Sequence, residues 1–182
     1  MAVEFRSAVR ADAREIARLF QISSEGVSDY IWSQIAEPGQ DLLDVGAIRY
    51  ARDDVDFSYQ NCLIAEADGQ VIGMMHSYAM RHDPLAVPTT DLVLAPYADM
   101  EVPDTLYISS LALHEGWRNR GLGKQFLAHA QERADRLGLN GLSLIDYAAN
   151  TGARRFYERH GFGIIKTCQV TPHPMIRVTG DA

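Results

Sequence analysis

The stretch Leu111-Ala-Leu-His-Glu-Gly-Trp-Arg-Asn-Arg-Gly-Leu-Gly-Lys124 determines how the rest of this sequence is interpreted. Its first residues are typical of a strand, Gly121 and Gly123 predict a turn, and an amphipathic helix follows. A helix that begins at such a turn directs unpaired N–H groups and the positive end of its dipole toward one point. Arg118, Arg120 and Lys124 add positive charge. The stretch therefore predicts a binding site for a phosphate or pyrophosphate.

Two common phosphate motifs do not fit this stretch. Gly116 and Gly121 have the separation of a P-loop, but Leu122 occupies the position of the essential lysine. Gly121 and Gly123 begin a dinucleotide fingerprint, but Phe126 stands where the third glycine belongs. The pattern that remains is Arg-x-x-Gly-x-Gly, beginning at Arg118. It resembles the coenzyme A pyrophosphate loop of the GNAT superfamily of acetyl-CoA-dependent N-acetyltransferases.

The resemblance continues toward the C-terminus. The segment 150–162 is similar to the Asn-x-x-Ala-x-x-x-Tyr-x-x-x-Gly-Phe signature of the family, matched at Asn150, Ala153, Tyr157, Gly161 and Phe162. The two motifs have the order and separation of the family and together cover about residues 106–165. The first hundred residues match only in their pattern of elements.

The resemblance implies a set of residues that bind acetyl-CoA. Backbone groups along one strand would hold the pantetheine arm, and backbone amides of the turn would bind the pyrophosphate. The expected cofactor-binding residues are Leu111, Ala112, Leu113, Arg118, Asn119, Arg120, Gly121, Leu122, Gly123, Lys124, Asn150 and Phe156. Plainer interpretations stay open: a core strand for 111–113, solvated arginines at 118 and 120, and a helix cap at 150.

Acetyl transfer requires that an amine loses a proton and that the departing thiolate gains one. The resemblance implies direct transfer without an acyl-enzyme, with Tyr157 as the general acid that protonates the CoA sulfur. Tyr157 also suits an apolar helix face as a packed aromatic. We expect His129 and His160 to be packing residues rather than bases.

The sequence leaves the general base open. Many relatives place Glu or His on the fourth strand, facing the amine. On that strand, 105–113, alternation counted back from Leu111 puts Ser109 and Tyr107 on one face, and neither is a strong base. The remaining candidates, acting through water, are Asp146, Glu25, Asp29 and Glu101. Aromatic and histidine side chains in segments that usually border the acceptor could bind a cation or simply pack in the core. These residues are Tyr30, Trp32, His76, Tyr78 and His82.

Composition limits the classes of protein that fit. The chain has 182 residues, which suggests one domain spanning 1–182, and no apolar run approaches the ~18 residues that cross a membrane. The two cysteines, at 62 and 168, form no disulfide framework or metal spacing, and we expect both to be buried. With no signal peptide in the N-terminal residues, a cytoplasmic protein that needs no metal is the simplest interpretation.

Charge is distributed unevenly along the chain. The net charge of −7 argues against a nucleic-acid partner. Residues 1–105 contain 7 Arg/Lys and 18 Asp/Glu, a balance of −11, whereas residues 106–182 contain 10 and 6, a balance of +4. The acidic half could favour a cationic amine or could simply be a solvated surface. Dimers are common among GNAT relatives, so a homodimer is also compatible with the sequence.

The order of elements predicts an α/β fold. Strands are expected at 5–9, 62–67, 70–80, 105–113 and 142–147, with two more near 163–170 and 174–179. Helices are expected near 12–23, 27–36, 41–52, 121–137 and 150–160, with one turn within the proline-rich loop 81–104. The resemblance implies a mixed, mostly antiparallel sheet of six to seven strands, splayed between its fourth and fifth strands and flanked by helices.

Three functions remain in competition. The first is an N-acetyltransferase that acts on an amine of a small molecule, an amino acid or a protein. The second, motivated by the missing base, is a catalytically silent module of the same fold that binds acyl-CoA as a sensor or partner subunit. The third keeps the chemistry but uses another acyl donor, such as succinyl- or propionyl-CoA.

Overall fold

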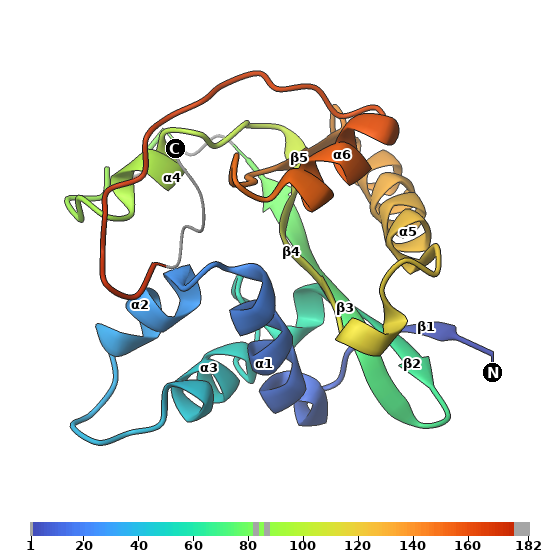
Figure 1. Ribbon diagram of the computed structural model, residues 1–182, viewed down its shortest axis with the longest axis horizontal. Coiled ribbons are helices and arrows are strands. Elements are labelled where there is room, and N and C mark those ends of the chain that lie inside the picture. The colour runs from blue at the N-terminus through green and yellow to red at the C-terminus, as the bar shows by residue number, and fades with distance from the viewer. Residues whose placement is uncertain (1, 82–83, 86–87, 177–182) are drawn as a thin grey trace.

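A five-stranded mixed sheet forms the centre of the computed structural model, which describes residues 2–81, 84–85 and 88–176 (Figure 1). The strands follow one another in sequence order: β1 (Glu4–Ser7), β2 (Cys62–Ala67), β3 (Gln70–Met80), β4 (Thr105–Leu113) and β5 (Leu142–Leu144). The first four pair antiparallel, and β5 runs parallel to β4. The hairpin β2–β3 has the bounds that the sequence predicts.

Helices cover both faces of the sheet. One face carries α1 (Ala13–Ser23), α2 (Val27–Ser33) and α3 (Leu42–Tyr50), and the other carries α5 (Leu122–Arg136) and α6 (Thr151–Arg159) (Figure 1). The remaining elements are α4 (Ala95–Ala98) and the 3-10 turns η1 (Arg10–Asp12), η2 (Tyr59–Asn61) and η3 (Glu115–Trp117).

Alternating side chains of the strands feed two separate cores. Met74 packs into the core beneath α1 with Ile16 and Leu19, whereas its neighbour Met75 packs into the core beneath α5 with Phe126. This is the period of two that a strand buried on both faces must show. The central strands are therefore fixed from both sides.

A β-bulge interrupts the alternation in β4. His76 pairs with Ser110 and Ser77 pairs with Ile108, so Ser109 is an extra residue with no counterpart on β3. Ile108 accordingly packs beneath α5, whereas Ala112 packs beneath α1. Strict alternation would have put both on one face.

The bulge corrects one sequence expectation. Tyr107 lies against Tyr78, with ring centroids 5.5 Å apart, and Ser109 contacts His76, so both side chains are on the α1 and α3 face. Leu111 packs beneath α5 instead. Alternation along the strand predicts Ser109 and Tyr107 on the same face as Leu111, but the structure places both on the opposite face.

The C-terminal strands are also corrected. The described part of the chain forms five strands rather than six or seven, and residues 163–176 contain none. This segment instead crosses α4 and descends to α2 (Figure 1). Thr171 Oγ1 donates to Leu92 O at 2.7 Å, and the His173 ring lies 4.3 Å from Tyr30. Its apolar residues Ile164 and Ile165 stay exposed, so the alternation in sequence did not lead to sheet pairing. The rest of the last predicted strand, 177–179, lies outside the described residues.

Two hydrogen bonds fasten the proline-rich segment over the sheet. Tyr30 on α2 donates to Asp91 at 2.8 Å. At the other end, the hydroxyls of Tyr97 in α4 and Tyr147 after β5 lie 2.6 Å apart. The segment therefore bridges the α2 side and the β5 side, above the ends of β3 and β4 (Figure 1).

Candidate functional site

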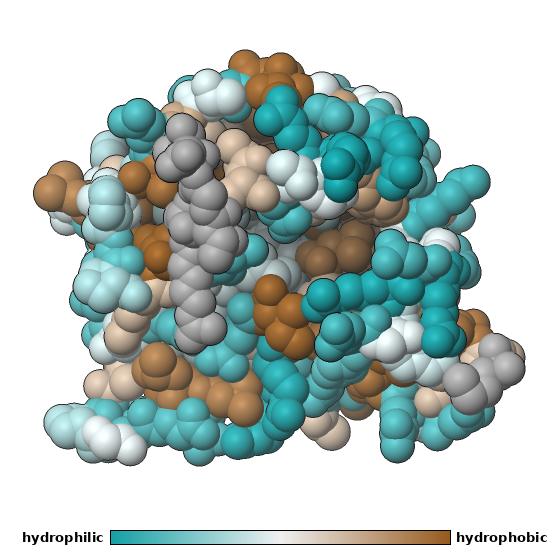
Figure 2. Space-filling model, viewed as in Figure 1, coloured by the Kyte–Doolittle hydropathy of each residue, from teal (hydrophilic) through white to brown (hydrophobic). Residues whose placement is uncertain are grey.

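A cleft of about 480 Å³ opens between β4 and β5, and we call it the central cleft. Pairing of β4 with β5 covers only three residues and ends at Ile108, so the following residues of β4 border the cleft. Its lining comprises Ile22, Ser23, Glu25, Ile108, Ser109, Ser110, Leu111, Ala112, Leu113, Arg118, Leu144, Ile145, Asp146, Asn150, Gly152, Ala153 and Tyr157. In Figure 2 this side of the molecule is recessed in its middle, with many hydrophilic side chains around the recess.

A second hollow of about 930 Å³ adjoins the cleft beyond β5. The two share Leu144, Ile145, Asp146 and Tyr157, and the second is otherwise lined by α6, the segment 160–170 and the α4 region. The shared residues therefore lie between two open spaces. One space borders β4, and the other borders the segment 160–170, where the sequence predicts a strand near 163–170.

The two glycines of the predicted phosphate loop have different tasks. Gly121 has φ +78°, a left-handed conformation that L side chains rarely adopt, and it precedes the first residue of α5. A Cβ at Gly123 would lie 2.8 Å from Cζ of Phe156 on α6. Gly121 therefore shapes the turn, whereas Gly123 allows close packing of α5 against α6. From the sequence, both glycines are expected in the turn and among the cofactor-binding residues.

Positive charge gathers at this end of α5. Arg118 lines the cleft, and its Nε donates to Leu113 O at 3.1 Å, which places the guanidinium beside the end of β4. The guanidinium of Arg120 lies over the Trp117 ring, 4.8 Å from the centroid. Asn119, Arg120 and Lys124 are exposed at the turn. The N-terminal amides of a fifteen-residue helix and these side chains make a positive rim.

The other predicted cofactor residues divide into cleft and packing positions. Leu111, Ala112 and Leu113 line the cleft while Ala112 is buried in the core, so the two interpretations of this strand are compatible. Asn150 caps α6, its Oδ1 accepting from Ala153 N at 3.2 Å, and also lines the cleft. Leu122 and Phe156 belong to the core beneath α5.

Tyr157 projects from α6 into the cleft. Its ring packs against Phe156 and Phe162, with centroids 5.2 Å and 5.4 Å away. Burial, with a contribution from the negative charge of Asp146, raises the pKa of the Tyr157 phenol well above its ordinary value. The hydroxyl is therefore protonated throughout the neutral range and can donate a proton.

Asp146 follows β5 and lies in the same cleft. Burial raises the pKa of this carboxyl to about 6, and the charge of Glu25 adds to the effect, while the Tyr147 amide and Arg154 oppose it. A carboxylate with a pKa near 6 is ionised at neutral pH, yet more basic than an ordinary aspartate. Of the four acids considered from the sequence, only Asp146 and Glu25 line the central cleft.

The other two acids are placed less favourably. Asp29 accepts a hydrogen bond from Gln21 Nε2 at 2.7 Å on the α1–α2 side. Glu101 lies in the exposed loop before β4, and burial of its carboxyl raises its pKa. Neither is part of the lining of the central cleft.

The remaining candidates have varied surroundings. Trp32 is a core residue, Tyr30 binds Asp91, and Tyr78 is partly buried between Phe57 and Tyr107. His82 lies outside the described residues. As expected, His129 packs on Phe5 and His160 bonds to its own helix at Phe156 O, 2.7 Å away. Cys62 is buried, but Cys168 is exposed, which corrects the expectation for it.

Sequence reasoning missed contacts that only the fold creates. The hydroxyls of Ser23 and Ser110 lie 2.6 Å apart and join α1 to β4 at the cleft. His114 lies 2.7 Å from Glu15 at the far end of β4. His76, noted only as an aromatic neighbour of the acceptor, is fully buried and contacts Ser109. These partners are 87, 99 and 33 residues apart, so no local signal could reveal them.

Metal binding and membrane crossing concern the described residues as a whole. No group of three or more His, Cys, Asp or Glu side chains there has an arrangement that could hold a metal ion. Among the same residues, no helix is both long and apolar enough to cross a bilayer.

Comparison with known proteins links this geometry to a family. Residues 28–162 match the model of the acetyltransferase (GNAT) family. An uncharacterized N-acetyltransferase, YycN of Bacillus subtilis, is 37% identical over 67 residues, an alignment that covers 36% of this chain and 43% of the relative. The chain thus aligns with less than half the length of that curated relative.

Solved structures show the same fold. The N-acetyltransferase from Staphylococcus aureus Mu50 has a TM-score of 0.64 at 19% identity, covering 92% of this chain and 94% of that one. An aminoglycoside N-acetyltransferase in complex with CoA has a TM-score of 0.58 at 16% identity, with 95% of each chain covered. With the family match over most of its length, this α/β chain, a five-stranded mixed sheet between two layers of helices, belongs to the GNAT acetyltransferase family.

Proposed function

We propose that this protein transfers the acetyl group of acetyl-CoA directly to a primary amine of a small molecule, an amino acid or a protein. The observation that carries the proposal is the composition of the central cleft. One cleft joins the guanidinium-bearing Arg118 before α5, the unpaired edge of β4, a protonated phenol and a carboxylate of raised pKa. These are the parts that binding a thioester and attacking it with an amine require.

The cleft suits acetyl-CoA along its whole length. The amides of residues 119–124 and the guanidinium of Arg118 would hold the pyrophosphate. Beyond Ile108 the β5-facing edge of β4 borders open space, so its backbone can pair with the pantetheine arm like an added strand. We infer that the sheet splays at this point to admit the arm. Acetyl-CoA supplies the acetyl thioester, and an amide near Leu113 would polarise its carbonyl.

Asp146 is our candidate for the general base. An amine attacks only as the free base, and Asp146 can take the proton directly or through a water molecule because its raised pKa makes it a better acceptor. Asp146 passes the ammonium proton to solvent before the attack. As the N–C bond forms and the C–S bond breaks, the nitrogen gives a second proton to this carboxylate, and that proton then restores the phenol of Tyr157 after the phenol has protonated the sulfur.

Tyr157 is our candidate for the general acid. Its phenol keeps its proton at neutral pH and lies in the same cleft, on the helix opposite β4. Donation of this proton to the departing sulfur yields neutral CoA thiol. The acid and the base would both be ready at the same pH, because burial raises each pKa from a different starting value.

The acceptor side is proposed to favour a cationic amine. Glu25 and Asp146 line the cleft, and the half of the chain that covers this side carries the balance of −11. Negative potential raises the local concentration of an ammonium ion. A substrate with several amines would gain most from this field.

The experiment measures CoA release by the purified chain with acetyl-CoA and a panel of amines: spermidine, kanamycin and a peptide beginning with alanine. We expect release and a matching acetylated product with at least one amine. Tyr157→Phe should lower kcat by about 10²-fold while leaving the Kd of CoA within about twofold. CoA release with none of the three amines would contradict the proposal and favour a silent acyl-CoA binder. A Tyr157→Phe variant that turns over as fast as wild type would contradict the role of Tyr157 as general acid.

Tyr50→Phe is the matched control for this substitution. The Tyr50 hydroxyl is buried and has no hydrogen-bond partner among the described residues, and Tyr50 is not part of the cleft lining. Its loss should leave kcat unchanged. Because an unsatisfied buried hydroxyl costs free energy, this variant should be at least as stable as wild type in a thermal melt.

A further inference from the structure

A buried histidine stands behind the wall of the central cleft. His76 on β3 is fully buried, and its Nδ1 lies 2.5 Å from Oγ of Ser109, the bulged residue of β4. Its Nε2 lies 2.8 Å from the backbone oxygen of Asp56. Ser109 is only partly buried and lines the cleft with Asp146 and Tyr157. A chain of hydrogen bonds thus runs from the loop before β2 to the cleft.

The chemistry of these groups determines which atom donates in each hydrogen bond. The carbonyl of Asp56 can only accept, so Nε2 of His76 must carry the hydrogen. In a neutral imidazole the other nitrogen is then an acceptor. Ser109 must therefore donate its hydroxyl hydrogen to Nδ1 of His76.

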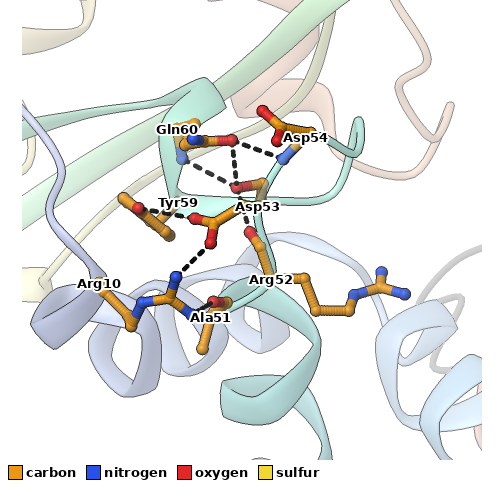
Figure 3. A network of polar contacts seen from close by, with 8 residues as sticks. Arg10, Ala51, Arg52, Asp53, Asp54, Tyr59 and Gln60 are labelled. Carbon is orange, nitrogen blue, oxygen red and sulfur yellow. Dashed lines mark hydrogen bonds and ion pairs between the residues drawn. The ribbon is translucent and has the colours of Figure 1, made fainter.

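The position of the Asp56 carbonyl is itself fixed. This oxygen also accepts from the Ser58 amide at 3.0 Å and from Asn61 Nδ2 at 2.9 Å. The loop that carries it is braced by the network of Figure 3. There Arg10 reaches Ala51 and Asp53, Tyr59 donates to Asp53, and the amide of Asp54 donates to Gln60.

The environment of His76 keeps the ring neutral. Burial, with smaller contributions from the charges of Arg133 and Arg49, lowers the pKa of His76 to about 4, against the opposing effect of the hydrogen bond to the Asp56 carbonyl. Aromatic rings of Tyr50, Phe57 and Tyr78 surround the imidazole at 5.1–5.7 Å between centroids. A ring this difficult to protonate is a poor destination for the proton of an amine. It can, however, hold its partner hydroxyl in one orientation.

We propose that Ser109 is the group that receives an N–H of the acceptor amine, and that His76 is the positioning residue that fixes the Ser109 hydroxyl as an acceptor. The inference deepens the proposed function and rests on it. With its own hydrogen directed to His76, Ser109 has only lone pairs to offer a ligand in the cleft.

This polarity identifies which part of the ternary complex Ser109 can bind. The carbonyl and sulfur of a thioester have no hydrogen to donate, and the pantetheine amides are proposed above to pair with the backbone of β4. The attacking amine, by contrast, keeps at least one N–H after losing its ammonium proton. That N–H would bond to Ser109 Oγ, leaving the nitrogen lone pair for the acetyl carbon. Ser109 and His76 keep their own protons throughout, and the proton released in the reaction goes to Asp146.

The first test separates the two substrates by their KM values. Ser109→Ala should lower kcat/KM for the best amine of the panel by about tenfold, the cost of one lost hydrogen bond to a charged or reacting group. Ser109→Thr, which keeps the hydroxyl, should retain most of the wild-type kcat/KM for the amine. The KM for acetyl-CoA should stay within about twofold. The control is Ser77→Ala, one position from His76 but facing α5, where Arg133 still binds the Ser77 carbonyl at 2.8 Å.

The second test addresses His76. His76→Asn retains an acceptor near the position of Nδ1, whereas His76→Phe removes this acceptor. The Asn variant should therefore keep a higher kcat/KM for the amine than the Phe variant. Both variants should bind CoA with equal affinity in calorimetry. Nitrogen NMR of the wild-type ring at neutral pH should show the hydrogen on Nε2. This measurement needs no acceptor and so remains informative even if wild type releases no CoA and the proposed function fails.

Three results would overturn the inference. They are a hydrogen on Nδ1 of His76, a Ser109→Ala variant whose amine kcat/KM stays within twofold of wild type, and a loss that falls on the KM of acetyl-CoA instead. The last would mean that Ser109 binds an amide N–H of the pantetheine arm.

Discussion

At the scale of single residues, burial raises the pKa of two cleft side chains but leaves them in different protonation states at neutral pH. The carboxyl of Asp146 has its pKa raised to about 6, which leaves it ionised at neutral pH. The phenol of Tyr157 is moved further from neutrality, so it never loses its proton in the working range. In the proposed reaction, the pKa of Asp146 would set a lower pH limit, whereas Tyr157 would set no limit near neutral pH.

The pH profile of kcat should reflect this difference. A base must be deprotonated, so kcat at saturating substrates should rise through about pH 6 and level off above it. Because the pKa of Tyr157 is raised, we expect no fall caused by loss of its proton up to about pH 10. Asp146→Asn should remove the rise near pH 6 and lower the plateau by about 10²-fold. A rise near pH 6 that persists in Asp146→Asn would assign it to another group.

The same carboxyl should have the opposite effect on stability. Its pKa is higher in the folded state than in the unfolded chain, so the folded state holds the proton more tightly. Stability is therefore lost as pH rises from the ordinary aspartate value to about 6. Asp146→Asn should melt at or above the wild-type temperature near about pH 7.5 and should converge with wild type below about pH 4. Lower stability of the variant at neutral pH would indicate a structural partner for the carboxylate.

Individual site residues could be predicted only where a local motif carried them. Arg118, Asn150 and Tyr157 were found in this way, and the structure places all three in the lining of one cleft. The pairing of Ser109 with His76 could not be found, because it depends on the register of β3 against β4. Of the four acids considered as general base, only Asp146 and Glu25 line the cleft, and the sequence alone does not reveal this.

At the scale of elements, the junction of α5 and α6 depends on two glycines with unequal roles. Gly123 leaves room for the Phe156 ring, and Gly121 supplies a left-handed turn with no side-chain atom of another residue within 4 Å of its would-be Cβ. Gly123→Ala should therefore lower the melting temperature by pushing α6 away. Gly121→Ala should chiefly weaken CoA binding, because about 1–2 kcal/mol of backbone strain would reshape the turn.

A double substitution separates packing from binding at this junction. In Gly123→Ala combined with Phe156→Leu, the smaller side chain should restore most of the lost stability. Gly116→Ala is the control, since this glycine is in the same loop and a Cβ there meets nothing within 4 Å. Melting curves and CoA calorimetry check the set. If the double variant is no more stable than Gly123→Ala, the ring contact does not explain the glycine.

Elements were predictable where their cause is local. The bounds of β4 match the expected strand, and α5 and α6 begin where a turn glycine and a capping asparagine predict. The bulge at Ser109 has no local signature, because two adjacent serines suit either face of a strand. The segment 163–176 shows the limit most clearly: its apolar residues Ile164 and Ile165 stay exposed, and the segment contacts Leu92 and Tyr30 instead of another strand.

At the scale of the whole molecule, opposite charge balances meet at the central cleft. The half with a balance of −11 supplies Ser23 and Glu25 to its lining, and the half with +4 supplies Arg118, which precedes α5. Such a division suits an anionic donor and a cationic acceptor that enter one cleft together. Added salt should therefore screen two separate attractions: that of the anionic donor to the positive half and that of the cationic acceptor to the acidic half.

The acceptor preference can be tested through that salt response. Raising NaCl from about 50 to about 500 mM shortens the Debye length from over 10 Å to a few ångströms, so distant charges stop contributing. The KM of spermidine should then rise several-fold, whereas the KM of a zwitterionic peptide beginning with alanine should change little. Glu25→Gln should weaken the salt dependence for spermidine, because Glu25 lies at the cleft, whereas Glu37→Gln, on an exposed loop after α2, should not. Equal salt dependence for the two amines would mean that the acidic half is a solvated surface with no part in choosing the substrate.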